Sequence, residues 1–302
     1  MNNKRRLFST LLCVAALTAG LFVSGCGSDK AGGIGSVVSS VVDGGSDEKA
    51  AAKLNTLIDA TNRFNGDNAT WGQNYADNLA KLKGGFQEGA IGRQPHYDTL
   101  KEALEQSKKE GSTFKEVDTE RDNVLNVLNE LVPTFKDLKA YDDSKAYMND
   151  GGAKGKELAA KYVAQVEKFD AAYAKFNDAL NKANTEQTKK QIEKLKKDGK
   201  KGYAAAMEST LRLTTLVENV EKAPKNADKQ AVEKELNEIQ TLLKSINNDR
   251  GEVLVNSYNS VVGSVRQVLT DANENNLNDM IENFNNYIES YNNTTPDQFD
   301  SK

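Results

Sequence analysis

The feature that most constrains this chain is the spacing of its apolar side chains, which recur every three or four residues from residue 47 onward. That period places them on one face of a helix, which is then buried against its neighbours. The clearest stripe is Val117, Val124, Leu128, Leu131, Phe135 and Leu138. A longer one is Leu158, Tyr162, Val166, Phe169, Tyr173, Phe176 and Leu180. Because the strand signal is almost absent, the sequence predicts an all-α fold.

Many stripes joined by short connections favour one elongated antiparallel bundle of about six to eight helices. We expect some helices to be long and kinked, with Pro133 as one kink because proline removes a backbone hydrogen bond. Helix boundaries stay open at 199–202 and at 271–276, where the chain either bends or breaks. The same spacing would serve a coiled-coil seam in a dimer, but a monomer is the favoured interpretation. The residues after Thr294 are expected to form a frayed tail.

The N-terminus has the features of a bacterial secretory signal. Residues 1–6 carry three cations, and the uncharged apolar run Leu7–Val23 follows them. The run is shorter than the roughly 20 apolar residues that a transmembrane helix needs. It leads into Val23-Ser24-Gly25-Cys26, the pattern of a lipobox. The sequence therefore predicts a signal peptide at 1–25, with diacylglycerol and an N-acyl lipid on Cys26. A free cysteine after an ordinary cleavage site is the alternative.

Lipidation would decide where the protein resides. Cys13 leaves with the signal and the thiol of Cys26 is alkylated, so the mature chain has no cysteine for disulfide or metal chemistry. Two or three acyl chains suffice for stable anchoring. Residues 26–46 are rich in Gly and Ser and predict a flexible tether, which leaves one helical domain over 47–302. The residue after the cysteine is Gly27 and not Asp, so the chain resembles lipoproteins that are sorted to the outer membrane. We therefore expect the outer membrane, facing the periplasm, in a host with two membranes, and otherwise the outer face of the cell membrane.

Composition narrows the function classes further. The 302 residues hold 40 Lys and Arg against 44 Asp and Glu, and the formal charge of −4 becomes −7 once the three cations of the signal are removed. A chain this acidic is not built to coat nucleic acid, which needs a surplus of cations against phosphate. One histidine and two cysteines exclude most metal and redox chemistry. No nucleophile motif accompanies His96, so a surface histidine is the favoured interpretation.

Two stretches of the chain carry a family resemblance. The first is the run Lys53–Asp59 with Asn62. The second comprises Tyr141, Asp142, Lys145, Tyr147, Asp150 and the run Ala153–Leu158. Over about residues 48–293 the chain resembles the YiiG-like proteins, an uncharacterised family of bacterial lipoproteins. The resemblance implies a lipobox, a low-complexity tether and an all-helical domain, and it implies no activity. Where the family often has a histidine, this chain has Ala159, so no role of that histidine transfers.

The best candidate site is a calcium loop near the C-terminus. Oxygen-bearing side chains occupy positions 1, 3, 5, 9 and 12 of an EF-hand pattern: Asp271, Asn273, Asn275, Asp279 and Glu282. Two departures weaken the match, because Asn276 stands where the turn wants Gly and Asn278 where an aliphatic side chain is usual. A polar turn between helices, or one continuous helix, is the alternative.

Two further features could bind a partner. Tyr141, Asp142 and Tyr147 lie beside the family motif and could line a pocket, although tyrosines packed on the bundle beside a solvated loop are the commoner arrangement. Residues 189–201 hold seven lysines against two acids and could touch anionic lipid head groups or glycans. A solvated helix face is the alternative interpretation of that stretch.

The leading hypothesis is a non-enzymatic, membrane-anchored envelope lipoprotein, whose helical bundle binds an unidentified envelope protein or glycan or spans a gap. The alternative is a ligand- or calcium-binding helical module in the periplasm or at the cell surface. An unrecognised hydrolase comes third, because bundles can hold carboxylate pairs in their cores. Converging buried carboxylates would favour the enzyme and metal hypotheses, and surface carboxylates would count against both.

Overall fold

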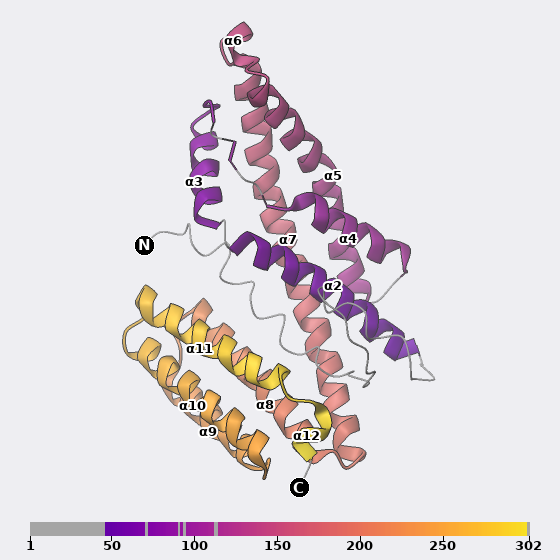
Figure 1. The fold of residues 1–302 in the computed structure, drawn as a ribbon, viewed down its shortest axis with the longest axis vertical. Helices are drawn as coiled ribbons and strands as arrows, with labels where there is room; N and C mark the ends of the chain where they lie inside the picture. The colour runs from indigo at the N-terminus through magenta and orange to yellow at the C-terminus, as the bar shows by residue number, and fades with distance from the viewer. Residues whose placement is uncertain (1–45, 70–71, 90, 93–94, 112–113, 301–302) are drawn as a thin grey trace, which may run out of the picture. The chain divides into compact units, whose positions relative to one another are not determined.

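The computed structural model describes five stretches of the chain: 46–69, 72–89, 91–92, 95–111 and 114–300 (Figure 1). These residues form eleven helices, α2 to α12, and contain no strand, so the all-α prediction is confirmed. The sequence predicted about six to eight helices. The structure has more in part because it includes two very short ones, α6 of four residues and α12 of five. The predicted signal peptide, the lipobox with Cys26 and nearly all of the tether lie outside the described stretches. No described helix combines the length and the apolarity that crossing a membrane requires.

The described residues divide into two compact units, and the first covers residues up to Ala183. It contains five whole helices and the first part of a sixth: α2 (Ser46–Ala69), α3 (Gly72–Lys83), α4 (Tyr97–Lys109), α5 (Lys115–Asp143), α6 (Tyr147–Asp150) and α7 (Ala153–Lys197). The two stripes that predicted long helices supply its core, where Leu128 and Phe176 are completely buried. The period of the sequence therefore identified the buried faces of α5 and α7 correctly.

Helices α5 and α7 pack as an antiparallel pair, which Figure 1 shows in magenta and pink. The ring centroids of Phe135 and Tyr162 are 5.8 Å apart. Near the other end of α5, Lys182 Nζ lies 2.7 Å from Glu116 Oε2. Because a late residue of each helix meets an early residue of the other, the two run in opposite directions. The whole of α5 stays helical through Pro133.

The second unit begins at Asn184, within α7. Its remaining helices are α8 (Lys201–Lys222), α9 (Lys229–Lys244), α10 (Asp249–Thr270), α11 (Glu274–Asn292) and α12 (Pro296–Asp300). Helix α8 contacts α9 and α11, and α10 contacts α9 and α11, so these four close into a bundle (Figure 1). The core of this bundle is formed largely by aliphatic side chains, among them Leu254, Val261 and Val265.

N-cap side chains set the starts of α9, α10 and α11, and the two open boundaries both prove to be breaks. The carboxylate of Asp228 accepts hydrogen bonds from the first turn of α9, and the amide oxygen of Asn248 does the same for α10. Asn273 caps α11, so the chain breaks between α10 and α11. Helix α7 ends at Lys197, and Gly199 has a φ of +79°, a left-handed conformation that suits glycine. The chain therefore also breaks between α7 and α8.

The C-terminal segment is packed, which corrects the expectation of a frayed tail after Thr294. Residues 296–300 form α12, and Phe299 is 2% exposed. Its ring stacks on Tyr203 and Tyr291, with centroids 5.8 and 6.0 Å away. The Asp300 carboxylate accepts a 2.6 Å hydrogen bond from the backbone N–H of Gly202, at the start of α8. One aromatic residue among polar neighbours makes no stripe, so the helical period could not reveal this contact.

The division between the two units falls inside α7, between Ala183 and Asn184. No Gly- or Pro-rich linker marks the position in the sequence. One helical domain over residues 47–302 stays a prediction, and each unit is described by itself below.

Candidate functional site

The three predicted pocket residues lie where α5 ends and α6 begins. The buried Tyr141 donates a 2.6 Å hydrogen bond from its hydroxyl to Asp150 Oδ1. Phe86 packs against both tyrosines, with ring centroids 5.2 Å from Tyr141 and 5.7 Å from Tyr147. Asp142 accepts a long 3.4 Å hydrogen bond from the backbone N–H of Gly89. The structure therefore gathers the predicted residues around the segment that carries Phe86, and ligand binding there stays a prediction.

The same cluster fixes the start of α7. The Asp150 carboxylate accepts hydrogen bonds from the backbone N–H groups of Gly152 at 2.9 Å and Lys154 at 3.1 Å. Together with the bond from the Tyr141 hydroxyl, which is the largest cause, these bonds lower the pKa of Asp150. A Cβ atom on Gly155 would lie 2.6 Å from ring atoms of both Phe86 and Tyr141. The positive end of α7 is thus already matched by a carboxylate of the chain itself.

The predicted calcium residues are exposed and belong to a helix start. Asn273 Oδ1 accepts a 2.9 Å hydrogen bond from the N–H of Asn276, and Asn273 Nδ2 donates to Asp271 at 2.7 Å. Because α11 begins at Glu274, the fourth position of the expected loop is already helical. The other predicted ligands, Asn275, Asp279 and Glu282, are exposed residues of α11. Calcium binding stays a prediction, and the hydrogen bonds of Asn273 are those of an ordinary N-cap.

Acidic side chains do not converge inside either unit in the described part of the chain. None of the Asp and Glu residues there is fully buried. No three His, Cys, Asp or Glu side chains of these stretches form a group that could hold a metal ion. His96 is exposed immediately before α4. The buried, converging carboxylates that would favour the enzyme and metal hypotheses are therefore not found among the described residues.

Sequence reasoning missed a polar cluster in the core of the first unit. The hydroxyl groups of Tyr75 and Tyr97 form a 2.9 Å hydrogen bond, and the buried Tyr162 interacts with both. Burial raises the pKa of all three hydroxyls, so they stay neutral at physiological pH. Tyr162 was expected only as a core side chain, since the helical period gives no information about hydrogen-bond partners.

Asp170 borders this tyrosine cluster. Partial burial raises the pKa of its carboxyl group to about 6, an effect that the positive charge of Lys83 reduces and the negative charge of Glu167 increases. One sequence signal could have revealed this residue. Asp170 follows Val166 by four residues and Tyr162 by eight, so the acid lies on the apolar stripe of α7.

The basic stretch 189–201 lies at the end of α7 and the start of α8, and all seven of its lysines are exposed. Lys196 Nζ lies 3.3 Å from Glu193 and 2.9 Å from Glu208, which joins the two helices. An open depression lies beside this bridge, lined by Lys189, Ile192, Glu193, Lys196, Glu208, Leu211 and Arg212. Its floor is apolar, because Ile192 and Leu211 are buried core residues.

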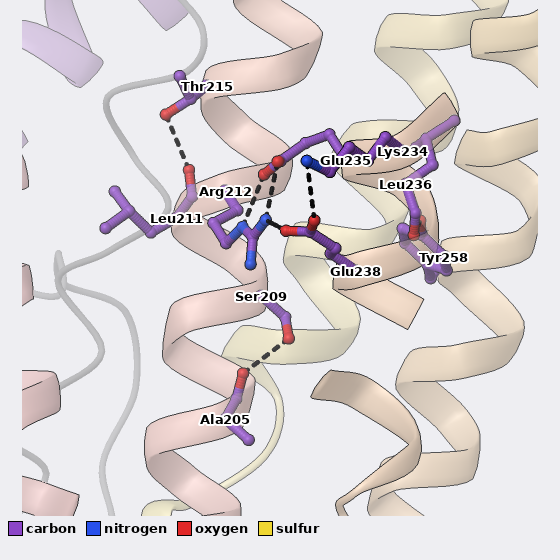
Figure 2. Close-up of polar contacts among 10 residues, drawn as sticks. All are labelled: Ala205, Ser209, Leu211, Arg212, Thr215, Lys234, Glu235, Leu236, Glu238 and Tyr258. Atoms are coloured by element: carbon purple, nitrogen blue, oxygen red, sulfur yellow. Dashed lines mark hydrogen bonds and ion pairs between the residues drawn. The ribbon is translucent and has the colours of Figure 1, made fainter. Parts of the chain in front are cut away.

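Arg212 forms the other edge of the depression and is fixed by two acids of α9 (Figure 2). Its Nε and Nη2 atoms donate to the two carboxylate oxygens of Glu235 at 2.6 and 2.8 Å, and Nη2 also contacts Glu238. Lys234 approaches Glu238 from the same helix, at 3.9 Å. The bond from Arg212 lowers the pKa of Glu235. Because the guanidinium group is already matched by two carboxylates, Arg212 links α8 to α9 and is a weak candidate for binding an anion.

Comparison with known proteins adds one match. The model of the family described as "Protein of unknown function (DUF3829)" matches residues 48–290. The match begins in α2 and ends in α11, so it includes both units. No curated protein and no solved structure matches the chain.

Proposed function

Because the chain belongs to the DUF3829 family, whose function is unknown, we propose its role from its own residues. It is a non-enzymatic envelope lipoprotein, anchored to a membrane by lipid on Cys26, whose helical units form a binding or structural module. The motif at residues 141–158 supports a place among the YiiG-like lipoproteins within the family. In a host with two membranes it sits on the outer membrane facing the periplasm, and otherwise on the outer face of the cell membrane.

One observation carries this proposal, namely the lipobox Val23-Ser24-Gly25-Cys26 at the end of a charged and then apolar leader. The signal peptidase needs small side chains at the two positions before the cysteine, and Ser24 and Gly25 are both small. The Gly- and Ser-rich residues 26–46 then suit a tether between a membrane and a folded part. The acidic net charge supports a chain that does not bind nucleic acid.

The helical part supports a binding or structural role more than a catalytic one. Its cores are packed with apolar and aromatic side chains. Its charged residues pair mostly at the surface, as Lys83 does with Glu167 and Lys108 with Asp122. We propose that the protein acts as a monomer, without a cofactor beyond its covalent lipid. Its partner is the membrane, together with an envelope protein or glycan.

The two cysteines give a matched test of the anchor. Cells expressing the full chain are fed an alkyne analogue of palmitate, and the protein is examined for the label and for membrane fractionation. Cys26→Ser should abolish both labelling and membrane retention, because the thiol is the acylation site. Cys13→Ser should leave both unchanged, since that residue leaves with the signal. Labelling that survives Cys26→Ser would refute the proposal.

The alternative is a calcium-binding module, which the spacing of Asp271 to Glu282 and the exposure of the five side chains favour. Native mass spectrometry of the purified mature protein, with and without calcium, tests it. A stoichiometric calcium adduct that disappears in Glu282→Gln would establish the site. Glu289→Gln removes an exposed acid of the same helix outside the predicted ligands and is the control. An unchanged mass on addition of calcium would remove this alternative.

A further inference from the structure

A group of exposed lysines lies at the junction of α7 and α8 in the second unit, and we name it the basic face. It comprises Lys189, Lys190, Lys194, Lys196, Lys197, Lys200 and Lys201. Within the same stretch only Glu193 and Asp198 carry negative charge. The stretch itself has an excess of five positive charges, on a chain whose formal net charge is −4. Three acids that contact it from α8 and α12, namely Glu208, Asp297 and Asp300, reduce this excess to two.

The protein itself neutralises only part of the basic face. Lys196 is bridged to Glu193 and Glu208, and Lys200 Nζ lies 2.9 Å from Asp297 Oδ1. Four others, by contrast, form no ion pair with any described part of the chain: Lys189, Lys190, Lys197 and Lys201. Their charges are exposed, so an external anion can reach them without displacing a carboxylate of the protein.

The helix dipoles explain some of these lysines and not others. Lys194, Lys196 and Lys197 lie in the last turn of α7, where a cation is favoured by the negative end of the helix. Lys200 and Lys201 lie at the N-cap and first residue of α8, where the positive end of the helix disfavours a cation. Two acids of α12 already act there, because Asp297 pairs with Lys200 and the Asp300 carboxylate accepts a hydrogen bond from the first turn of α8. Lys201 has no partner acid in the described residues, so its charge is the one at the start of α8 that an external anion can compensate.

We propose that the basic face rests on anionic phospholipid head groups of the membrane that carries the lipid anchor, an inference that depends on the proposed function. A lipid anchor on Cys26 would confine the folded part to the neighbourhood of the membrane, so that anionic head groups are present at a high effective concentration. Each lysine near an anionic surface then contributes roughly a fivefold gain in affinity.

The contact is electrostatic and does not insert into the lipid. In the described stretches, the large apolar side chains that are exposed are those of Met148 and Val253, and neither residue belongs to the basic face. The apolar floor of the neighbouring depression is buried. Attraction between exposed charges is screened by salt, with a Debye length of about 10 Å at 0.1 M. The contact should therefore weaken steeply as ionic strength rises.

The test uses the mature lipoprotein reconstituted on vesicles of phosphatidylcholine, with or without added phosphatidylglycerol. The mature chain has no other free thiol, so a single cysteine can carry a fluorophore. Asp198→Cys places it in the basic face, and Asp279→Cys places it in α11, near the turn that joins α10 to α11. A lipid with a nitroxide on its head group quenches a fluorophore that lies against the membrane surface.

We expect quenching at residue 198 that is several-fold stronger with phosphatidylglycerol, is lost at high salt and exceeds the quenching at residue 279. The triple variant Lys190→Gln, Lys197→Gln and Lys201→Gln should abolish the difference between the two lipids. The matched control is Lys161→Gln, Lys168→Gln and Lys175→Gln, which removes three exposed lysines of α7 outside the basic face. This control should behave like the unmodified protein, and the circular dichroism of both triple variants should stay helical.

Flotation separates failure of the anchor from failure of the basic face. Flotation on phosphatidylcholine alone reports the anchor, because that surface has no net charge for lysine to bind. If the protein floats there but residue 198 is quenched equally on both lipids, or on neither, the basic face does not bind anionic head groups. The same conclusion follows if the lysines bind an acidic glycan or protein instead, since residue 198 would then not be quenched. If the protein does not float, the lipid anchor fails independently.

Discussion

The two units reach the same helical architecture with different cores. In the first unit, aromatic rings contact one another, and Phe169 alone meets Phe64, Tyr97 and Tyr173 with centroids 4.9 to 5.9 Å apart. In the second unit the ring contacts gather around Phe299, and the rest of the core is mostly Leu, Val, Ile and Ala. Both cores satisfy the same three- and four-residue period, so the period sets which face is buried but not what kind of core results.

Polar groups also differ between the units. The first unit holds a half-buried acid, Asp170, beside hydroxyl groups that bond to each other. In the second unit, the hydroxyl of Tyr287 forms a 3.0 Å hydrogen bond with the hydroxyl of Thr210. The acid Glu235 of this unit lies at the surface, where it forms an ion pair with Arg212. Burial of an unpaired acid costs free energy, whereas pairing at the surface adds a little. We therefore expect the two units to respond differently to substitution and to pH.

The largest effect should come from truncating a buried ring in each core. Phe169→Ala and Phe284→Ala each remove a ring that is at most 3% exposed, at a cost of about 3–5 kcal/mol of unfolding free energy. Phe169 should cost more, because each ring pair adds about 0.5–1.5 kcal/mol beyond burial, and Phe284 makes no ring contact in the described part of the chain. Denaturant unfolding, with hydrogen exchange of peptides from each unit, measures both. An equal or larger cost at Phe284 would contradict the comparison.

The next effect concerns two helical glycines, one in each unit. Replacing them by alanine should change the free energy of unfolding with opposite signs. Gly155→Ala forces a methyl group against Phe86 and Tyr141 and should destabilise by about 1–3 kcal/mol. Gly263 is an exposed residue of α10 with open space around its Cβ position, so Gly263→Ala should stabilise by about 1 kcal/mol. Melting temperatures of the two variants give the signs directly. If Gly155→Ala also stabilises the protein, the ring cluster is less tightly packed than described.

The sequence predicted the fold well because burial follows a period that is local along the chain. Leu128, Tyr162 and Phe176 were assigned to buried stripes, and all three are completely buried. Phe299 was missed because its burial depends on Tyr203, almost one hundred residues away in sequence. A contact of that kind has no local signature.

The candidate sites were predicted less well, for a related reason. The spacing of Asp271 and Asn273 fits a metal loop, but Asn273 is equally suited to cap a helix, and the structure uses it as a cap. Spacing alone cannot choose between these uses, since both need a short polar side chain at the same position. The tyrosine cluster beside Asp170 was not predicted, because hydrogen-bond partners come from three separate helices.

The third effect is a pH dependence of opposite sign at two carboxyl groups, one in each unit. Burial raises the pKa of Asp170 from 3.8 to about 6, so the unfolded chain ionises first and the contribution of Asp170 to the stability of the first unit falls as pH rises from about 4 to 6. Arg212 lowers the pKa of Glu235 below 4.5, so this pair stabilises the second unit above that pH and is lost on acidification. Asp170→Asn should remove the first dependence, and Glu235→Gln the second.

Hydrogen exchange of core peptides across this pH range, corrected for intrinsic rates, measures the two units in one sample. Compared with Asp170→Asn, the unmodified protein should gain protection on acidification in peptides around Tyr162. Compared with Glu235→Gln, it should lose protection in peptides of α8 and α9. If Asp170→Asn leaves the pH profile of the first unit unchanged, its carboxyl group is not the source of that dependence.

The smallest effect is the cost of replacing an arginine by lysine, compared between a buried arginine of the first unit and a half-exposed one of the second. The Arg121 side chain is 5% exposed and bonds to Asp118 and Asp122, whereas that of Arg212 is 27% exposed. Replacing either by Lys keeps the charge but loses the planar two-point geometry. Arg212→Lys should cost about 0.5 kcal/mol, and that cost should shrink at high salt because the pair is partly screened.

Arg121→Lys should cost more, and its cost should depend less on salt, because the ion pair of Arg121 with Asp118 is shielded from solvent. The free energy of unfolding of both variants, measured at low and high salt, gives the two dependences. Equal salt sensitivity would mean that Arg121 is hydrated in solution despite its packing. The difference between the units would then lie in their rings and in Asp170, and not in their ion pairs.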